Sequence, residues 1–253
     1  MLKELLMAGF LLFGQSQDHK ADIAKMQDAL KADGVDISMY IKDPRFEIYR
    51  VKSLNRKTIA IDYTNTKQSK YMQPSSIERS EKFMEDEKNW LELAERVYGV
   101  DREYLTALLN MESSLGDDTG GYRVLNALVS QYLNTANEDT EKFFYEEIKE
   151  FIAFAKKKGI RDVLEIRGSF AGAMGPMQFM PSNLRKYGVD FDGDGSFVIS
   201  DRQDAIGSSA NFLADKGFKD SPEKALKAYN PKQPTFVTAI QKHAKTLKEK
   251  AKK

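Results

Sequence analysis

Apolar residues recur every three to four positions through most of the chain, which is the spacing of amphipathic helices. Residues 80–99 follow it clearly, and Gly99 ends that run. Asp101 is placed to cap the next helix, and Ser221 followed by Pro222 starts a later one. The helices expected on this basis cover residues 18–33, 80–99, 101–112, 122–133, 138–158, 202–217, 222–229 and a last stretch after Pro234.

Three stretches depart from the helical spacing. Residues 46–63 are rich in β-branched and aromatic side chains, which fits short strands or extended packing segments equally well. Residues 64–79 are polar and typical of a loop, and residues 168–204 combine dense glycine with clustered aspartate. The sequence therefore predicts a mostly α fold with an irregular centre.

The chain is expected to have three parts. Residues 1–16 resemble a secretory signal, since Lys3 precedes a short apolar run that ends in small residues; an amphipathic first helix is the alternative. That run is too short to span a bilayer permanently. We expect residues 17–79 to form a helical and extended segment that packs on the core, and residues 80–250 to form the main domain.

Composition removes several kinds of chemistry. The chain has 253 residues, a net charge of +1, no cysteine and only two histidines, which lie near opposite ends. Disulfides, thiol nucleophiles and a lipid-modified N-terminal cysteine are excluded, and neither a zinc protease motif nor a Ser-His-Asp triad is expected. The near-neutral charge gives no support for nucleic acid as a partner. Any catalysis must use carboxylates, lysine, tyrosine or oxygen ligands.

Glu112 is the first candidate for catalysis. It lies on the apolar face of its predicted helix, seven residues after Leu105 and near the helix end. Burial of a carboxyl raises its pKa and keeps it protonated near neutral pH, as a general acid requires. The alternative is a charged residue at a frayed helix end.

Small residues dominate the stretch Gly168–Ser182, with sequence GSFAGAMGPMQFMPS. Such density suits close approach to another backbone or to a ligand, and tight helix packing is the alternative explanation. Ser169 and Gln178 supply neutral hydrogen-bonding groups that suit sugar hydroxyl or acetamido groups. No Lys or Arg lies between Ser169 and Arg185, so a phosphate site is not expected.

The acidic stretch that follows has the pattern of a calcium loop. Asp190, Asp192 and Asp194 alternate ahead of Gly195, as in the first half of an EF-hand. Three carboxylates within five residues repel one another unless a cation compensates. An EF-hand has Glu at its twelfth position, where this chain has Asp201. The alternative is a solvated acidic turn.

Taken together, these motifs resemble the lytic murein transglycosylase B family (glycoside hydrolase family 103, lysozyme-like). The likeness covers about residues 80–230 and rests on segments that occur in the family's order and at similar spacing. They are Met111–Gly116, Arg123–Leu128, the glycine-rich stretch Gly168–Ser182, VDFDGDG at 189–195 and DAIGSSANFL at 204–213. Ser113, Leu115 and Pro176 depart from the family's usual residues.

The resemblance implies a lysozyme-like catalytic domain with an active-site groove, and it assigns roles to residues. The catalytic acid is Glu112, and the substrate-contacting residues are Ser169, Gln178, Tyr229 and Asn230. A structural calcium ion has ligands at Asp190, Asp192, Asp194, Ser196 and Asp204 within the loop 190–204, and no cofactor serves catalysis.

The function implied is cleavage of the β-1,4 bond between N-acetylmuramic acid and N-acetylglucosamine, leaving 1,6-anhydromuramic ends. A lysozyme-type hydrolase remains an alternative because Asp117 and Asp118 follow Glu112 closely, and so does a non-catalytic, calcium-stabilised glycan-binding envelope protein. The expected partner is the peptidoglycan glycan strand, with no nucleic acid and no stable membrane span. The expected state is a monomer, secreted to the bacterial periplasm or cell envelope and not lipid-anchored.

Overall fold

The structure is a computed structural model that describes residues 19–49, 70–231, 233 and 235–252. Within it the chain divides into two compact units between Asp43 and Pro44. The first unit contains helix α2 (Lys20–Ala32) and the single turn α3 (Ser38–Ile41). Met26 and Leu30 are fully buried on α2, as its apolar spacing predicts. The expected signal segment lies outside the described residues.

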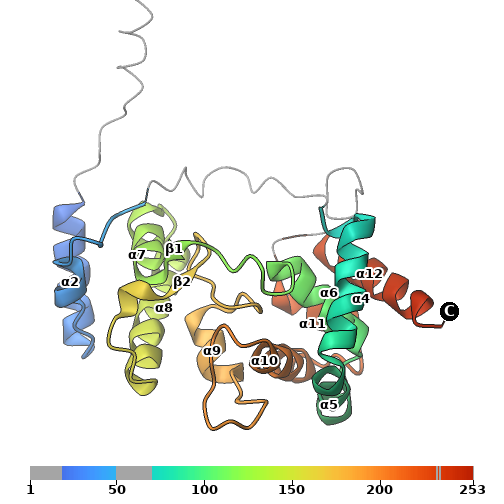
Figure 1. Cartoon of the computed structure of the whole chain (residues 1–253). Coiled ribbons are helices and arrows are strands. Elements are labelled where there is room, and N and C mark those ends of the chain that lie inside the picture. Colours follow the sequence, from blue (N-terminus) through green and yellow to red (C-terminus); the bar gives the residue numbers. More distant parts are fainter. Residues whose placement is uncertain (1–18, 50–69, 232, 234, 253) are drawn as a thin grey trace, which may run out of the picture. The chain divides into compact units, whose positions relative to one another are not determined.

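In the described residues of the second unit, helices are the main elements (Figure 1). Its elements are η1 (Lys70–Met72), α4 (Pro74–Asp86), α5 (Lys88–Tyr98), α6 (Arg102–Ser113), β1 (Tyr122–Arg123), α7 (Val124–Asn134), α8 (Glu138–Lys157), η2 (Val163–Glu165), β2 (Arg167–Gly168), α9 (Pro181–Tyr187), α10 (Arg202–Asp215), α11 (Pro222–Tyr229) and α12 (Phe236–Lys250). No described helix has the length and apolarity needed to cross a membrane.

Helix α6 lies at the centre of its part of this unit. It packs against α4, α5, α10 and α12, and its apolar face is fully buried at Leu105, Leu108 and Leu109. Helices α7 and α8 form a second packed pair, and α9 joins them by packing on α8. Burying an apolar side chain of this size contributes about 1.5–3 kcal/mol. The core around α6 therefore fixes the position of Glu112 at its end.

Three helix boundaries differ from the sequence expectation. The run 80–99 forms two helices, since α4 ends at Asp86 and Glu87 leaves the helical conformation. The carboxylate of Glu87 accepts a hydrogen bond from Gln203 Nε2 at 2.7 Å. Helix α4 begins at Pro74, inside the stretch expected to be a loop, since proline fits a first helical turn. It therefore runs across the boundary that we expected at residue 80.

The third difference concerns residues 122 and 123. Tyr122 pairs with Gly168, and Arg123 pairs with Arg167, in a short antiparallel ladder, so helix α7 begins only at Val124. The pairing places the end of the loop that follows α6 beside the start of the glycine-rich stretch. Sequence periodicity gave no sign of it, because two residues are too few to show a strand pattern.

Residues 46–49 belong to no helix or strand. Asn126 donates to the carbonyl of Arg45 at 3.0 Å, and the backbone N–H of Tyr49 donates to Ser130 at 2.8 Å. Side chains of α7 thus hold this segment by its backbone. The remainder of the 46–63 stretch lies outside the described residues.

Candidate active site

Glu112 is the penultimate residue of α6 and is half-buried. Within the described part of the chain, no hydrogen bond or ion pair reaches its carboxyl group. Removal from water raises the pKa of Glu112 to about 8. The carboxyl is therefore protonated at neutral pH and has a proton to donate.

The backbone beyond Glu112 is strained. Only three described residues other than glycine have a positive φ, namely Ser114 (53°), Leu115 (65°) and Gln178 (49°). Two of them directly follow the helix that carries Glu112, and the third belongs to the glycine-rich stretch. Residues held in this conformation persist only where their surroundings enforce it, and they cluster at functional sites.

Ser113 joins the end of α6 to the glycine-rich stretch. Its hydroxyl donates to the carbonyl of Pro176 at 2.7 Å and accepts the N–H of Gly116 at 2.9 Å. A side chain at Gly116 would meet the ring of Pro176 at 3.4 Å in a backbone conformation (φ 95°) that favours glycine. The segment that follows Glu112 is therefore packed directly against Pro176.

Ser169 closes a tight loop at the start of the stretch. Its N–H donates to the carbonyl of Ala173 at 2.8 Å, and its Oγ accepts the N–H of Ala173 at 3.0 Å. Gly168 has no room for a side chain, because a Cβ would lie 2.2 Å from the Ala173 oxygen. The small residues thus serve backbone packing here. No described residue accepts the hydroxyl proton of half-buried Ser169, which remains available to a ligand.

Gln178 is held by its amide nitrogen. Nε2 donates to the carbonyls of Thr119 at 3.1 Å and Gly175 at 3.0 Å, which ties the stretch to the segment beyond α6. No described donor reaches its Oε1. The side chain is half-buried, so this oxygen is a fixed acceptor that a ligand N–H or O–H can use.

Tyr229, the last residue of α11, also lies near Glu112. Burial raises the pKa of Tyr229 well above its usual value, and the charge of Glu112 raises it further. The phenol donates to the carbonyl of Met177 at 2.6 Å. The structure thus brings together Glu112, Tyr229 and the glycine-rich stretch. Asn230, which follows Tyr229, lines a cavity between α11 and α12.

Two exposed aromatic residues beside Ser169 were not among the sequence candidates. Phe170 is 55% exposed at the tip of its loop, and Tyr122 is 45% exposed opposite Gly168 in the β1–β2 ladder. Tyr49 packs edge-on against Tyr122 with ring centroids 5.2 Å apart, and this contact holds the ring of Tyr122 in place. Spacing gave no reason to separate these rings from core aromatics, since only the ladder brings Tyr122 to Ser169.

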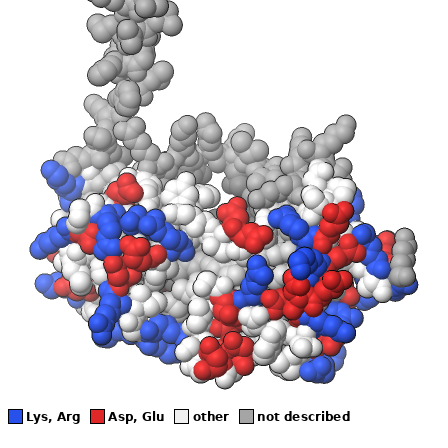
Figure 2. Space-filling model, in the orientation of Figure 1, with Lys and Arg blue, Asp and Glu red and all other residues white. Residues whose placement is uncertain are grey.

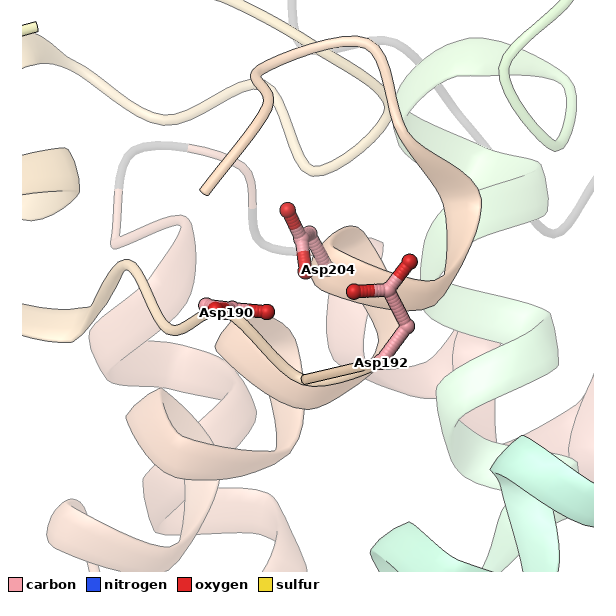
Figure 3. Close-up of side chains that lie close together, drawn as sticks. All are labelled: Asp190, Asp192 and Asp204. Atoms are coloured by element: carbon pink, nitrogen blue, oxygen red, sulfur yellow. The ribbon is translucent and has the colours of Figure 1, made fainter. Parts of the chain in front are cut away.

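The acidic loop converges on one point (Figure 3). One carboxylate oxygen from each of Asp190, Asp192 and Asp204 lies within 4.8 Å of the others. Asp204 is buried in the first turn of α10, and it accepts the N–H groups of Phe191 at 2.8 Å and Val198 at 2.6 Å. The pKa of Asp204 is raised, mainly by burial. Figure 2 shows acidic side chains gathered over this loop, which Figure 1 draws between α9 and α10.

The other residues of the loop have different roles. Asp201, at the twelfth position, caps α10 by accepting the N–H groups of Gln203 and Asp204. Asp194 and Ser196 are exposed, Asp194 accepts the N–H of Ser196 at 2.8 Å, and its carboxylate lies outside the cluster of three. The cluster suits a divalent cation with a preference for oxygen, because it offers hard ligands whose mutual repulsion such an ion removes.

Comparison with known proteins identifies the class. The model of the transglycosylase SLT domain family matches residues 16–253, and the chain belongs to this family. The membrane-bound lytic murein transglycosylase B of Escherichia coli (strain K12) is 35% identical over 159 residues, which cover 63% of this chain and 43% of that protein. The matched region thus spans less than half the length of this relative.

Two solved structures share the fold. The Escherichia coli lytic transglycosylase Slt35 in complex with calcium matches with a TM-score of 0.66 and 24% identity, over 73% of this chain and 78% of that one. SltB3 from Pseudomonas aeruginosa in complex with NAG-anhNAM-pentapeptide matches with a TM-score of 0.70 and 18% identity, over 92% and 80%. The mostly α, lysozyme-like fold expected from the sequence is confirmed.

Proposed function

We propose that this chain is a peptidoglycan lytic transglycosylase that uses Glu112 as its single acid and base. The observation that carries the proposal is the half-buried carboxyl of Glu112, whose pKa of about 8 keeps it protonated beside the glycine-rich stretch. The family membership and the relative's name, lytic murein transglycosylase B, support the same reaction.

The reaction needs only one carboxyl group. Protonated Glu112 donates its proton to the oxygen between N-acetylmuramic acid and N-acetylglucosamine as the bond from that oxygen to C1 of muramic acid breaks. The 6-hydroxyl oxygen of the same muramic acid then bonds to C1, and the Glu112 carboxylate takes the hydroxyl proton. The products are a free 4-hydroxyl and a 1,6-anhydromuramic end. Glu112 is protonated again, and no water is consumed.

Neighbouring groups would hold the glycan. Within the glycine-rich stretch, the hydroxyl proton of Ser169 and the Oε1 of Gln178 have no partner among the described residues, and they suit the acetamido and hydroxyl groups of muramic acid. Tyr122 and Phe170 offer exposed ring faces for the apolar faces of sugars. Tyr229 would help to keep water away from Glu112, and it is this removal from water that keeps the carboxyl protonated.

The hydrolase alternative has less support. A hydrolase of the lysozyme type needs a second carboxylate to serve the intermediate or to activate water. Asp117, one of the two candidates, is exposed and lies 3.5 Å from Arg202 and 4.0 Å from Arg79. These cations would hold Asp117 at the protein surface.

We propose calcium as a structural ion for the loop 190–204. Asp190, Asp192 and Asp204 would hold it, with Asp194 and the carbonyl of Ser196 as further ligands once the ion draws the loop in. The calcium complex of Slt35 supports an ion of this kind in the fold. Its role would be to neutralise the loop's charge, and it would take no part in catalysis.

The proposed partner is the glycan strand of peptidoglycan, and the proposed place of action is the bacterial periplasm or cell envelope, where that substrate lies. The relative is named as membrane-bound, which supports a location in the cell envelope. We propose action as a monomer.

Product analysis tests the function. Purified murein is digested in water labelled with oxygen-18, and the products are identified by mass spectrometry. We expect unlabelled 1,6-anhydromuramic ends from the wild-type chain, a loss of at least about a hundredfold with Glu112→Gln, and little change with Asp117→Asn. Labelled reducing ends, or loss of activity with Asp117→Asn alone, would favour the hydrolase.

A further inference from the structure

Gln131 is a buried amide on α7 whose side chain reaches the loop at Phe170. It is fully buried, and its Nε2 donates to the carbonyl of Phe170 at 3.0 Å. Its Oε1 is also buried and has no hydrogen-bond partner among the described residues. A buried acceptor without a donor is unfavourable, and an apolar side chain of the same length would avoid it. Core packing alone therefore does not explain a glutamine at this position, whereas its bond to Phe170 does.

Phe170 lies in a tight turn over residues 169–172. The N–H of Gly172 donates to the carbonyl of Ser169 at 3.0 Å, so Phe170 and Ala171 are the two central residues of the turn. The carbonyl that Gln131 holds belongs to the peptide group between these two residues, and the bond thus fixes the backbone at the tip of the turn. The ring of Phe170 is 55% exposed, so its direction depends mainly on the backbone that carries it.

Helix α7 contacts the same turn at a second point. Leu128 lies one helical turn before Gln131, and its side chain occupies the space that a side chain at Gly172 would need. This contact is apolar and sets no direction, whereas a hydrogen bond is directional. The orientation of the turn on α7 therefore depends on the bond from Gln131 to Phe170.

We propose that Gln131 is a positioning residue for glycan binding, which holds the turn 169–172 so that the exposed ring of Phe170 meets the apolar face of a sugar. The proposal rests on the proposed function, which assigns the ring of Phe170 and the hydroxyl of Ser169 to the glycan. A sugar that contacts both groups at once needs them in a fixed relation. Gln131 acts through Phe170, because its own side chain is fully buried and out of reach of a ligand.

The variant Gln131→Met tests this role, because methionine has a side chain of similar length without the amide. We expect the KM for glycan strands to rise about threefold to tenfold, with kcat within about twofold of the wild type. The melting temperature should stay within about 2 °C, since the lost bond to Phe170 is offset by removal of the unpartnered oxygen. Asn134→Leu is the matched control, because the amide of Asn134 bonds to the carbonyl of Ser130 within α7, and its KM should equal that of the wild type.

The same replacement in a Phe170→Ala background separates positioning from packing. If Gln131 acts through the ring, adding Gln131→Met should change the KM of Phe170→Ala by less than about twofold, because two residues that act together are not additive. An equal rise of KM in both backgrounds would overturn the proposal, and so would an unchanged KM in the wild-type background. Either result would make Gln131 a packing residue.

A binding measurement distinguishes this role from the reaction. Soluble glycan strands are titrated by calorimetry into Glu112→Gln and into the same variant with Gln131→Met added, and we expect the second to bind about threefold to tenfold more weakly. If the wild type cleaves no murein while this loss of affinity is seen, the reaction is wrong and the positioning role stands. If the wild type cleaves murein and the two affinities are equal, the reaction stands and the positioning role is overturned. Absence of binding by Glu112→Gln would count against both.

Discussion

The hydroxyl of Ser113 donates to the carbonyl of Pro176 at 2.7 Å, and this bond joins the residue beside the candidate acid to the centre of the glycine-rich stretch. The two residues are far apart in sequence and both are buried. Their contact fixes where the carboxyl of Glu112 lies relative to Ser169 and Gln178. A shift of about 1 Å at such a position is enough to reduce catalysis substantially.

Replacing Ser113 should therefore cost stability. Ser113→Ala leaves the carbonyl of Pro176 and the N–H of Gly116 without their partner, which is expected to lower the free energy of unfolding by about 1–3 kcal/mol. Ser113→Thr keeps the hydroxyl and is the matched control. Urea unfolding measures both. Equal losses in the two variants would mean that side-chain volume matters here and the hydrogen bond does not.

Glu112 should make the protein less stable as pH rises. Its pKa of about 8 lies above the unfolded value of 4.5, so the folded state binds more protons between these values. The contribution of Glu112 to stability is thus complete below pH 4.5 and is lost as pH rises to 8. Glu112→Gln removes this pH dependence. We expect the free energy of unfolding of the variant to gain about 1–3 kcal/mol relative to the wild type between pH 4.5 and pH 8.

Thermal unfolding at pH 4.5, 6 and 8 measures that difference. Glu78→Gln, at an exposed position on α4, is the control and should follow the wild type at each pH. A constant difference between Glu112→Gln and the wild type would show that Glu112 titrates normally and is unsuited to act as the acid.

The exposed rings should affect binding and leave stability unchanged. Tyr122→Ala and Phe170→Ala are each expected to raise the KM for glycan strands about threefold to tenfold, because each removes one exposed ring that is proposed to contact the sugars. Tyr122→Phe keeps the ring and should bind normally. Phe143→Ala is the control, since Phe143 is 46% exposed but lies on α8. If the melting temperature falls while KM holds, the rings are packing residues.

Calcium should raise the melting temperature of the wild-type chain, and a chelator should lower it. An ion at a hundred times its Kd stabilises a folded state by about 2.7 kcal/mol, because it binds only that state. Asp192→Asn is expected to remove most of this response. Asp201→Asn should retain it, since Asn caps a helix as well as Asp and Asp201 points at the α10 backbone. If calorimetry detects no calcium binding, the loop is only a solvated acidic turn.

His243 should make the protein sensitive to acid. It is fully buried, with Nδ1 bonded to the carbonyl of Tyr71 at 3.1 Å and Nε2 to the hydroxyl of Ser80 at 2.9 Å. Burial lowers the pKa of His243 to about 4, so the unfolded chain takes up a proton between pH 6.5 and 4 and the folded chain does not. Its contribution is complete above pH 6.5 and is lost as pH falls towards 4, by about 3 kcal/mol.

Denaturant melts of the wild type and His243→Gln at pH 7 and pH 4.5 check this. The variant should lose less stability on acidification than the wild type. His19→Gln, which changes the other histidine, serves as the control. Equal acid losses in all three proteins would assign the acid sensitivity to other groups.

The glycine-rich stretch shows how far local sequence reasoning reached. Its small residues correctly indicated close backbone approach, and the structure explains them by packing, as at Gly168 against Ala173. Whether such a stretch packs on the protein's own backbone or on a ligand depends on which segment of the chain lies opposite it. Residues 122 and 123 supply that partner through a two-residue ladder that leaves no periodic signal.

The sequence by itself determined most of the helices, the acid on an apolar helix face and the spacing of the acidic loop, because each follows from periodicity or from chemistry within a few residues. Tertiary structure alone decided which groups meet. It placed Tyr229 beside Glu112 and Tyr122 beside Ser169, and it gathered Asp204, which the family resemblance had already implied as a ligand, with Asp190 and Asp192. The physical reason is that pKa values, free hydrogen-bonding groups and ion sites depend on burial and on neighbours from distant segments, which no local pattern contains.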